Sequence, residues 1–179
     1  MTIGLIRHFK VDLPFNKPSY LPDEFDQQME RYDTAPVIPN KVIMNGIKWD
    51  VCYCSDLPRA QTTAKSVWVS DFNTTSLLRE VPISAFTKRQ IKLPGFLWHL
   101  GARISWRKNG KSQPETFAET IKRIEKLYEI IVSDGNENIL LVTHGFFIRV
   151  FQEHMKKKGF SGEVDFRPVN GKLYVLKNI

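Results

Sequence analysis

Residues 49–69 read WDVCYCSDLPRAQTTAKSVWV, and this stretch decides the fold that we expect. Its first six residues are mostly apolar and predict a short buried strand over 49–54. Ser55 or Asp56 can cap a helix that follows, with a proline in its first turn, where the missing N–H is not needed. We therefore predict a helix over 58–69, and the strand and helix together form one unit of an α/β protein.

The same alternation continues on both sides of this stretch. Apolar runs predict further strands, and apolar residues at helical spacing predict further helices. The strands are expected over residues 2–6, 74–78, 138–143, 164–166 and 172–176, and the helices over 23–32, 96–106, 117–132 and 146–155. This order predicts an α/β fold, a three-layer α/β/α sandwich with a largely parallel (mixed) central sheet. The 179 residues contain no repeat or linker, so we expect a single domain over 1–179.

Charge and hydropathy limit the classes of partner. The formal net charge of +7 favours an anionic substrate or partner. It does not indicate nucleic acid, because the basic residues are scattered and the one cluster, Lys156–Lys158, is typical of a solvated helix end. No apolar run approaches the roughly 20 residues that span a bilayer, and the N-terminus reaches Arg7-His8 too early for a signal peptide. We expect a cytoplasmic protein with no nucleic-acid or membrane partner, and the oligomeric state is not visible in the pattern.

The two cysteines, Cys52 and Cys54, are one residue apart, so they share one face of the predicted strand. A metal site or a redox pair is the alternative to two small buried thiols. Because nothing nearby has ligand spacing, buried thiols are the favoured interpretation.

Residues with phosphate chemistry follow the predicted strands where each strand ends. The first strand leads to Arg7 and His8, the second to Arg59, the third to Glu80 and the strand over 138–143 to His144. Each of these residues alone is more often structural. Parallel sheets, however, place ligands outside the carboxyl ends of their strands, so we expect all five at one edge. Two arginines there favour a tetrahedral oxyanion over a metal ion.

Five motifs in this order resemble the signatures of the histidine phosphatase superfamily (phosphoglycerate mutase-like, branch 1 phosphatase). The matching stretches are Leu5-Ile6-Arg7-His8, SDLPRAQTTA over 55–64, Leu78-Arg79-Glu80, Pro114-Glu115-Thr116 and Val142-Thr143-His144-Gly145. They resemble, respectively, the family's Arg-His-Gly signature, its second signature, its Leu-x-Glu element, its Gly-Glu-Ser helix start and its final histidine motif. The resemblance implies a phosphoglycerate mutase-like fold.

The resemblance also implies the function and the role of each residue. It implies a metal-independent phosphomonoester hydrolase without cofactors, of the histidine acid-type, working through a phosphohistidine on His8. His8, Glu80 and His144 are then catalytic, with Glu80 as proton donor, and Arg7, Arg59 and His144 bind the phosphate. A phosphoglycerate mutase-type phosphotransferase and a catalytically impaired phospholigand-binding module are the alternatives. The chain has little room for the insertion that closes over the substrate in the mutases, which favours a phosphatase.

Two departures from the family pattern concern the substrate pocket. Phe9 stands where the glycine after the nucleophilic histidine is usual, which predicts a reshaped or narrowed pocket. Residues 81–84, Val81-Pro82-Ile83-Ser84, replace a glycine-rich continuation. We expect residues 81–112, with the loop over 9–22, to form a substrate wall or lid. Their basic residues, Lys88, Arg89, Lys92, Arg103, Arg107 and Lys108, indicate either a solvated face, which is favoured, or a second anionic group on the substrate. A small phosphorylated metabolite is the favoured substrate, and a phosphoprotein is the alternative.

Overall fold

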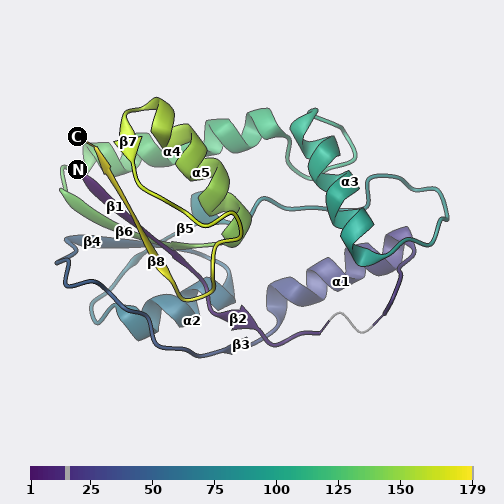
Figure 1. Ribbon diagram of the computed structural model, residues 1–179, viewed down its shortest axis with the longest axis horizontal. Coiled ribbons are helices and arrows are strands. Elements are labelled where there is room, and N and C mark those ends of the chain that lie inside the picture. Colours follow the sequence, from purple (N-terminus) through teal and green to yellow (C-terminus); the bar gives the residue numbers. More distant parts are fainter. Residues whose placement is uncertain (15–16, 179) are drawn as a thin grey trace.

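A six-stranded mixed sheet forms the centre of the computed structural model, which describes residues 1–14 and 17–178. Its strands are β1 (Thr2–Arg7), β4 (Val51–Ser55), β5 (Asn73–Thr75), β6 (Asn138–Thr143), β7 (Phe160–Ser161) and β8 (Leu173–Asn178). They are arranged in the order β5-β4-β6-β1-β8-β7 (Figure 1). The first four strands in this order are mutually parallel. At the other edge, β8 pairs antiparallel with β1, and β7 pairs antiparallel with β8. The predicted mixed sheet is confirmed.

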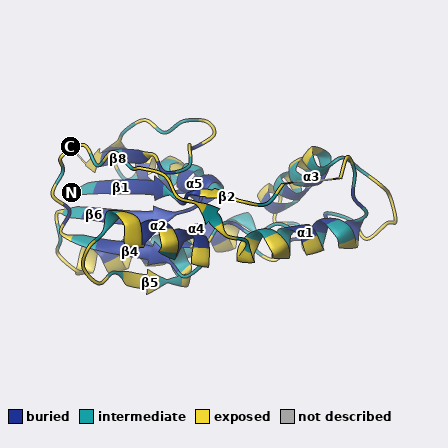
Figure 2. Cartoon of the chain, turned by 90° about the horizontal axis from the view of Figure 1, so that it is seen from below, coloured by how far each residue is buried: buried dark blue, intermediate teal, exposed yellow. Residues whose placement is uncertain are grey.

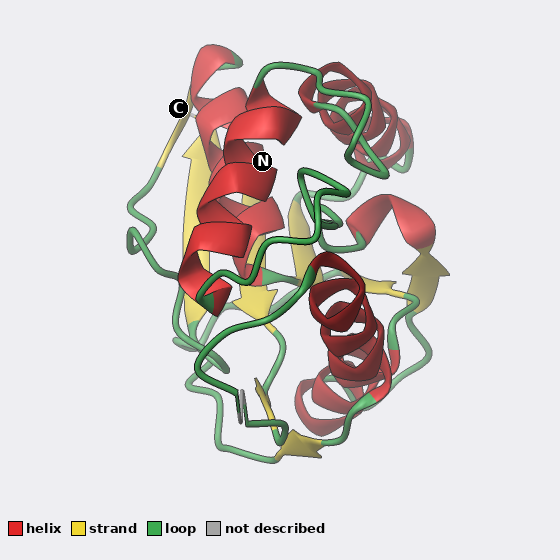
Figure 3. Cartoon of the chain, turned by 90° about the vertical axis from the view of Figure 1, so that its right-hand side faces the viewer, coloured by secondary structure: helices red, strands yellow, loops and turns green. Residues whose placement is uncertain are grey.

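Helices cover both faces of this sheet. Successive strand residues point to opposite faces, and because both sets of side chains are apolar, each face is buried under helices. On one face, Ile139 and Leu141 of β6 pack in a cluster with α4 (Phe117–Ser133) and α5 (Gly145–Lys157). On the other face, Leu140 and Val142 pack with α2 (Pro58–Val67). The three-layer α/β/α sandwich is therefore confirmed, and Figure 3 shows helices on both sides of the strands. Among the described residues, none of the helices is long and apolar enough to cross a membrane.

Two further helices, α1 (Pro22–Thr34) and α3 (Gly95–Arg107), lie beyond the carboxyl ends of the parallel strands (Figures 1 and 2). They have a separate small core of Tyr20, Phe25, Ala85 and Trp98. The Trp98 indole stacks near the Phe25 ring at 5.8 Å and donates to the Tyr20 carbonyl at 2.8 Å. We call α1, α3 and this core the α1–α3 unit.

The helix and strand predictions are close for most elements, and two strands are wrong. The strand expected over 74–78 ends at Thr75, because the Thr75 hydroxyl accepts from the Leu77 N–H and starts a 3-10 turn over Ser76–Leu78. Residues 164–166 are not a strand, and β7 lies earlier in the chain. We call residues 162–172 the tail loop; its backbone bonds to the end of β1, with the Gly171 N–H donating to the Arg7 carbonyl at 2.8 Å.

The loop predicted over 9–22 contains a short strand that the sequence did not indicate. This strand, β2 (Lys10–Val11), pairs antiparallel with β3 (Val37–Ile38), and residues 15 and 16 of the loop lie outside the described residues. Cys52 and Cys54 are buried and free, which confirms the interpretation as small thiols. Burial raises the pKa of Cys52 to about 12, so this thiol is not reactive at neutral pH.

Candidate active site

The carboxyl edge of the sheet brings the two predicted histidines together. β1 and β6 are parallel neighbours with Arg7 opposite Thr143, so the next residues, His8 and His144, leave the sheet side by side. The His8 N–H donates to the Thr143 carbonyl at 2.9 Å, and the two imidazole rings lie 5.0 Å apart between centroids. The ends of these two neighbouring strands thus bring His8 and His144 together at one edge of the sheet.

His8 is held as a neutral imidazole with one nitrogen available. Its Nδ1 lies 2.6 Å from the Phe9 carbonyl oxygen, which can only accept, so Nδ1 carries the proton and Nε2 keeps its lone pair. Burial, followed by the charge of Arg59, lowers the pKa of His8 to about 3. The Asn170 amide on the tail loop donates to the His8 carbonyl at 2.7 Å and fixes the backbone here. An unprotonated, oriented imidazole nitrogen is what a nucleophile needs.

His144 is fixed in the opposite tautomer. Arg59 Nε, which can only donate, points at His144 Nδ1 at 3.2 Å, so the proton of this imidazole lies on Nε2. That N–H donates to the Ser55 hydroxyl, 2.8 Å away, at the end of β4. Burial, then the charges of His8 and Arg59, lowers the pKa of His144 well below its usual value. Both histidines are therefore neutral at physiological pH.

Arg59 is buried next to the histidines because it follows the start of α2, whose N-terminus faces the sheet edge. Its side chain is 1% exposed, and its buried guanidinium forms an ion pair with Asp33. The NH1 group lies 2.9 Å from the Asp33 carboxylate and 3.2 Å from the Asp33 carbonyl oxygen, both at the end of α1. Sequence reasoning missed Asp33, since nothing in the pattern links the end of α1 with the start of α2.

Arg7 approaches the same place from β1. Its NH1 donates to the Pro168 carbonyl in the tail loop at 2.6 Å, whereas its buried Nε has no hydrogen-bond partner. A Cβ at Gly145 would come within 2.8 Å of that Nε, so the glycine leaves room for the guanidinium. An unpartnered, buried guanidinium nitrogen costs free energy that a bound oxyanion would recover.

Glu80 lies at the N-terminus of α5, directly beyond His144. Its two carboxylate oxygens accept from three backbone N–H groups, those of Val81 at 2.9 Å, Phe146 at 3.1 Å and Phe147 at 2.8 Å. These donors fix the carboxyl group, and two of them, the N–H groups of Phe146 and Phe147, belong to the first turn of α5. Glu80 also lines the cavity described next, so the structure places it beside the predicted phosphate site.

A cavity of about 820 Å³ opens at this edge of the sheet. Arg7, Arg59 and Glu80 of the predicted site line it, and the α1–α3 unit closes its far side through Met29 and His99. His8 and His144 do not line it, and only 2% and 0% of their surfaces are exposed. The Asp33 carboxylate, which does line the cavity, occupies Arg59 at the end where the histidines lie.

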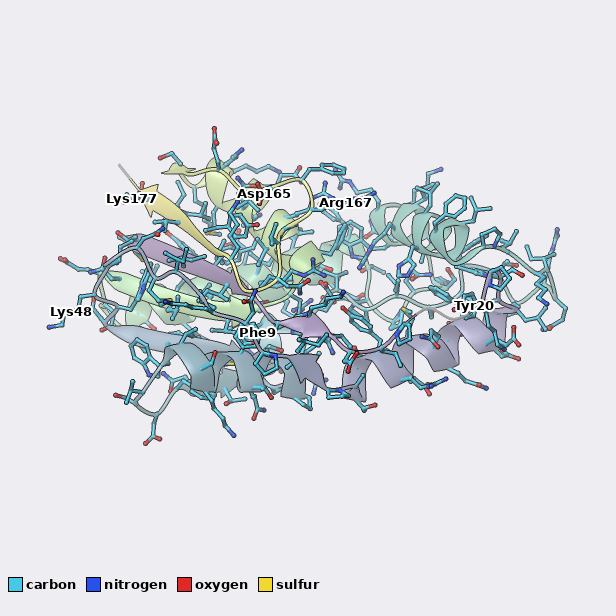
Figure 4. The ribbon with its side chains drawn as sticks, turned by 60° about the horizontal axis from the view of Figure 1, so that its bottom comes forward. Phe9, Tyr20, Lys48, Asp165, Arg167 and Lys177 are labelled. Carbon is cyan, nitrogen blue, oxygen red and sulfur yellow. The ribbon has the colours of Figure 1, made fainter. Side chains whose placement is uncertain are left out.

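Phe9 does not narrow this cavity, contrary to the expectation from the sequence. Its ring is 1% exposed, is not part of the cavity wall, and lies so close to Gly171 of the tail loop that a Cβ there would be 3.3 Å away. Its backbone N–H donates to the Thr63 hydroxyl of α2 at 2.9 Å. The backbone of Phe9 is thus tied to α2 while its ring lies against the tail loop, near the position labelled in Figure 4.

Only one of the basic residues singled out in residues 81–112 reaches the cavity. Arg103 lines it, and the other five, Lys88, Arg89, Lys92, Arg107 and Lys108, are exposed and do not. The cavity wall instead gains Arg149 of α5 and Arg167 of the tail loop, which sequence reasoning missed. A signal for Arg149 existed, because it lies four residues after Gly145 and so on the same helix face.

Residues able to hold a metal ion do not converge here. Within residues 1–14 and 17–178, no group of three or more histidine, cysteine, aspartate or glutamate side chains has a suitable arrangement. The arginine-rich wall is instead suited to an oxyanion.

The family model of the histidine phosphatase superfamily (branch 1) matches residues 42–178 of this chain. The chain belongs to the histidine phosphatase superfamily. The match includes Arg59, Glu80 and His144 but begins after Arg7 and His8, so the case for these two rests on the geometry above. A search of curated proteins finds no match.

Several solved structures share the fold. The α-ribazole phosphatase from Shigella flexneri is 18% identical, with a TM-score of 0.58 over 98% of this chain and 89% of that one. An open-reading-frame product of Mycobacterium tuberculosis is 15% identical, with a TM-score of 0.59 over 97% and 89%. A mycobacterial glucosyl-3-phosphoglycerate phosphatase is 17% identical, with a TM-score of 0.52 over 87% and 79%. The predicted phosphoglycerate mutase-like fold is confirmed.

Proposed function

We propose that this protein is a metal-independent phosphomonoester hydrolase that forms a phosphohistidine on His8. The observation that carries the proposal is the state of His8, a buried neutral imidazole whose Nδ1–H is bound to a carbonyl. Its Nε2 is therefore the nucleophilic atom. The His8 ring lies next to His144, which accepts from Arg59, and the charges of Arg59 and Arg7 act on it. Membership of the histidine phosphatase superfamily supports this reading.

In the first step, His8 Nε2 attacks phosphorus, the bond from phosphorus to the ester oxygen breaks, and Glu80 gives its proton to the leaving oxygen. In the second step, water attacks phosphorus, the N–P bond breaks, and Glu80 takes a proton from the water. Arg7 and Arg59 stabilise the equatorial oxygens as charge moves onto them. The His144 Nε2–H, which here donates to Ser55, is the donor that this histidine offers to a phosphoryl oxygen.

Access to His8 requires one exchange of partners. The Asp33 carboxylate occupies Arg59 NH1 at 2.9 Å, in a position that a phosphoryl oxygen would take. Asp33 is 54% exposed and lies at the last turn of α1, so it can move into solvent at small cost. We infer that substrate phosphate displaces Asp33 from Arg59 and then reaches His8.

The substrate class follows from the cavity. Val81, Ile83, His99 and Arg103 line it, which supports the prediction that residues 81–112 form a substrate wall within one domain over 1–179. The volume of about 820 Å³ is suited to a small metabolite. Two structural relatives are named as phosphatases of small phosphorylated compounds, α-ribazole phosphate and glucosyl-3-phosphoglycerate. We therefore propose a small phosphorylated metabolite as the substrate. The matching family is branch 1 of the superfamily, and the assignment of the enzyme to the histidine acid type stays a prediction.

A second candidate function is a phospholigand-binding module without turnover. The observation that favours it is that His8 and His144 are covered and do not line the cavity. In such a module, Arg7 and Arg59 would bind phosphate without transfer to His8.

Hydrolysis of p-nitrophenyl phosphate in the presence of a chelator separates the two candidates. A hydrolase retains activity in the chelator, loses it about 10⁴-fold or more in His8→Ala, and yields an acid-labile phosphoprotein when the reaction is quenched rapidly at alkaline pH. His154→Ala is the matched control, because His154 lies away from the site and pairs with Glu125. Wild-type protein that binds inorganic phosphate through Arg7 and Arg59 but does not turn over would favour the module. Activity that survives in His8→Ala would contradict the proposed mechanism.

A further inference from the structure

We propose that the cavity contains a second anion-binding subsite, formed by Arg103, Arg149 and Arg167. The substrate would then be a phosphomonoester that carries a second acidic group, a phosphate or a carboxylate, several bonds from the scissile phosphate. This inference rests on the proposed phosphatase function and specifies its substrate class.

The charges that line the cavity do not balance. Seven arginines line it, against three carboxylates. Three of the arginines are neutralised by ion pairs, namely Arg59 by Asp33, Arg79 by Asp56 and Arg123 by Glu115. In the part of the chain that the structure describes, the other four, Arg7, Arg103, Arg149 and Arg167, form no ion pair. Glu80, the one remaining carboxylate of the wall, is bonded to the backbone N–H of Val81 and to those of Phe146 and Phe147 at the start of α5.

Two of the unpaired arginines converge on one aromatic ring. The Arg103 guanidinium lies 3.7 Å from the centre of the Phe146 ring, and that of Arg149 lies 5.8 Å from the same centre. Arg149 also lies 4.1 Å from the centre of the Phe166 ring. A guanidinium stacked on a ring presents its N–H groups at its edge, where a carboxylate or phosphate can accept two of them.

The third arginine comes from the tail loop. Arg167 directly follows Phe166, and the Phe166 ring contacts the Arg149 guanidinium. Arg167 lines the same cavity. Figure 4 shows Arg167 on this loop. Three chain segments, α3, α5 and the tail loop, therefore contribute one arginine each to the cavity wall.

Mutual repulsion between these groups favours a bound anion. Burial lowers the pKa of Arg103 to about 10; the charges of Glu80 and Glu115 oppose this shift, whereas the charge of Arg149 acts in the same direction as burial. The Arg103 guanidinium is still protonated at neutral pH. Arg103 is held in place by its bond to the Val81 carbonyl at 3.0 Å. Gathering like charges in a partly buried wall is unfavourable unless an opposite charge joins them.

The distance from the phosphate end matches a small metabolite. Gly145 borders the Arg7 guanidinium, and Arg149 lies four residues later on α5. At a rise of about 1.5 Å per residue, the two positions are about 6 Å apart along the helix axis. Phe146 lies between them in the cavity wall, so a ligand with a short carbon chain can span the two positions while each end meets arginines.

Two open-chain ligands of equal length test the subsite. 6-Phosphogluconate and sorbitol 6-phosphate differ mainly in having a carboxylate or a hydroxymethyl group at the end opposite the phosphate. We expect His8→Ala protein to bind 6-phosphogluconate about tenfold to a hundredfold more tightly in calorimetric titration. Wild-type protein should show the same preference in kcat/KM.

Substitution assigns this preference to its residues. In Arg149→Gln, the ratio of the two affinities should fall by about tenfold or more, whereas the exposed Arg89→Gln, which lies outside the cavity wall, should leave the ratio unchanged. Arg103→Gln should lower it as well.

Equal affinities for the two ligands would overturn the subsite, and so would a preference that persists in Arg149→Gln and Arg103→Gln. If wild-type protein does not hydrolyse p-nitrophenyl phosphate, the proposed function is contradicted but the subsite is not, because the calorimetric comparison does not require turnover.

Discussion

The two ends of the cavity are built in different ways. At the phosphate end, His8 and His144 directly follow β1 and β6 and are almost fully buried. Both ring nitrogens of His144 and the Nδ1 of His8 have hydrogen-bond partners, which leaves the His8 Nε2 for a substrate. At the opposite end, Arg103 and Arg149 come from α3 and α5, are partly exposed and are not ion-paired. The first end is positioned by the sheet, and the second depends on the α1–α3 unit and the tail loop.

This difference separates chemistry from selection of the substrate. A sheet edge fixes backbone positions through its ladder, so residues that follow it are held with little freedom, as a nucleophile requires. Side chains on outlying helices and loops are held by fewer contacts, and such parts of a protein open more readily. We infer that the α1–α3 unit and the tail loop set which phosphomonoester is accepted, while the sheet edge carries out the transfer.

The largest expected effect concerns the stability of the α1–α3 unit. Trp98 is fully buried in its core and contacts the rings of Phe25 and Phe86. Trp98→Ala removes most of this small core, and we expect a cost of about 3–5 kcal/mol. Hydrogen exchange should then show protection lost in α1 and α3 while β1 and β6 stay protected.

Phe147→Ala is the matched change in the main core, since Phe147 is equally buried against the sheet. It should lower protection throughout the molecule. If Trp98→Ala also releases β1 and β6 to the same extent, the two regions unfold as one cooperative unit and the comparison fails.

A smaller effect follows from the neutral histidines at the phosphate end. Burial lowers the pKa of His8 from 6.5 to about 3 and that of His144 well below 6.5. Between these values the unfolded chain binds protons that the folded protein does not, so the stability present above pH 6.5 is lost as the pH falls. We expect the free energy of unfolding to decrease by about 1.4 kcal/mol per pH unit through His8 between pH 6 and pH 5, and His144 to add to the decrease in the same direction.

Urea unfolding at a series of pH values measures this slope. His8→Gln removes one of the two titrating groups and should reduce the slope by about 1.4 kcal/mol per pH unit. An unchanged slope in this variant would show that His8 is protonated in the folded protein and is not held as a neutral nucleophile.

The sequence predicts the phosphate end well because its information is local. Arg7 and His8 follow an apolar run, and His144 follows another, so the rule that parallel strands end at one edge is enough to bring them together. The helix that carries Arg59 is likewise predictable from its cap and its proline. The short motifs at this edge are visible in the pattern, whereas the strand order that makes β1 and β6 neighbours is known only from the structure.

The other end of the cavity could not be predicted, since it depends on contacts between distant segments. Arg149 appears in the pattern as one polar residue of an apolar helix, and Arg167 as part of a tail predicted to contain a strand over 164–166. The direction of the Phe9 ring depends on Gly171, which lies 162 positions later and leaves room for it. Tertiary packing decides all three, and no local propensity encodes it.

The smallest expected effect lies at the contact between the two regions, where Asp33 of α1 meets Arg59 of α2. Asp33→Asn removes the carboxylate that competes with phosphate for the Arg59 guanidinium, while it keeps the size of the side chain. Because the Asp33 carboxylate is half exposed and is solvated when phosphate displaces it, the competition is weak, and we expect inorganic phosphate to bind only about twofold to fivefold more tightly. Calorimetric titration measures this change, and Asp26→Asn, which removes the carboxylate of another α1 residue paired with exposed Lys88, is the matched control. Weaker phosphate binding in Asp33→Asn would mean that Asp33 positions Arg59 for phosphate and does not compete with it, and the α1–α3 unit would then belong to the chemistry of the site as well as to its selectivity.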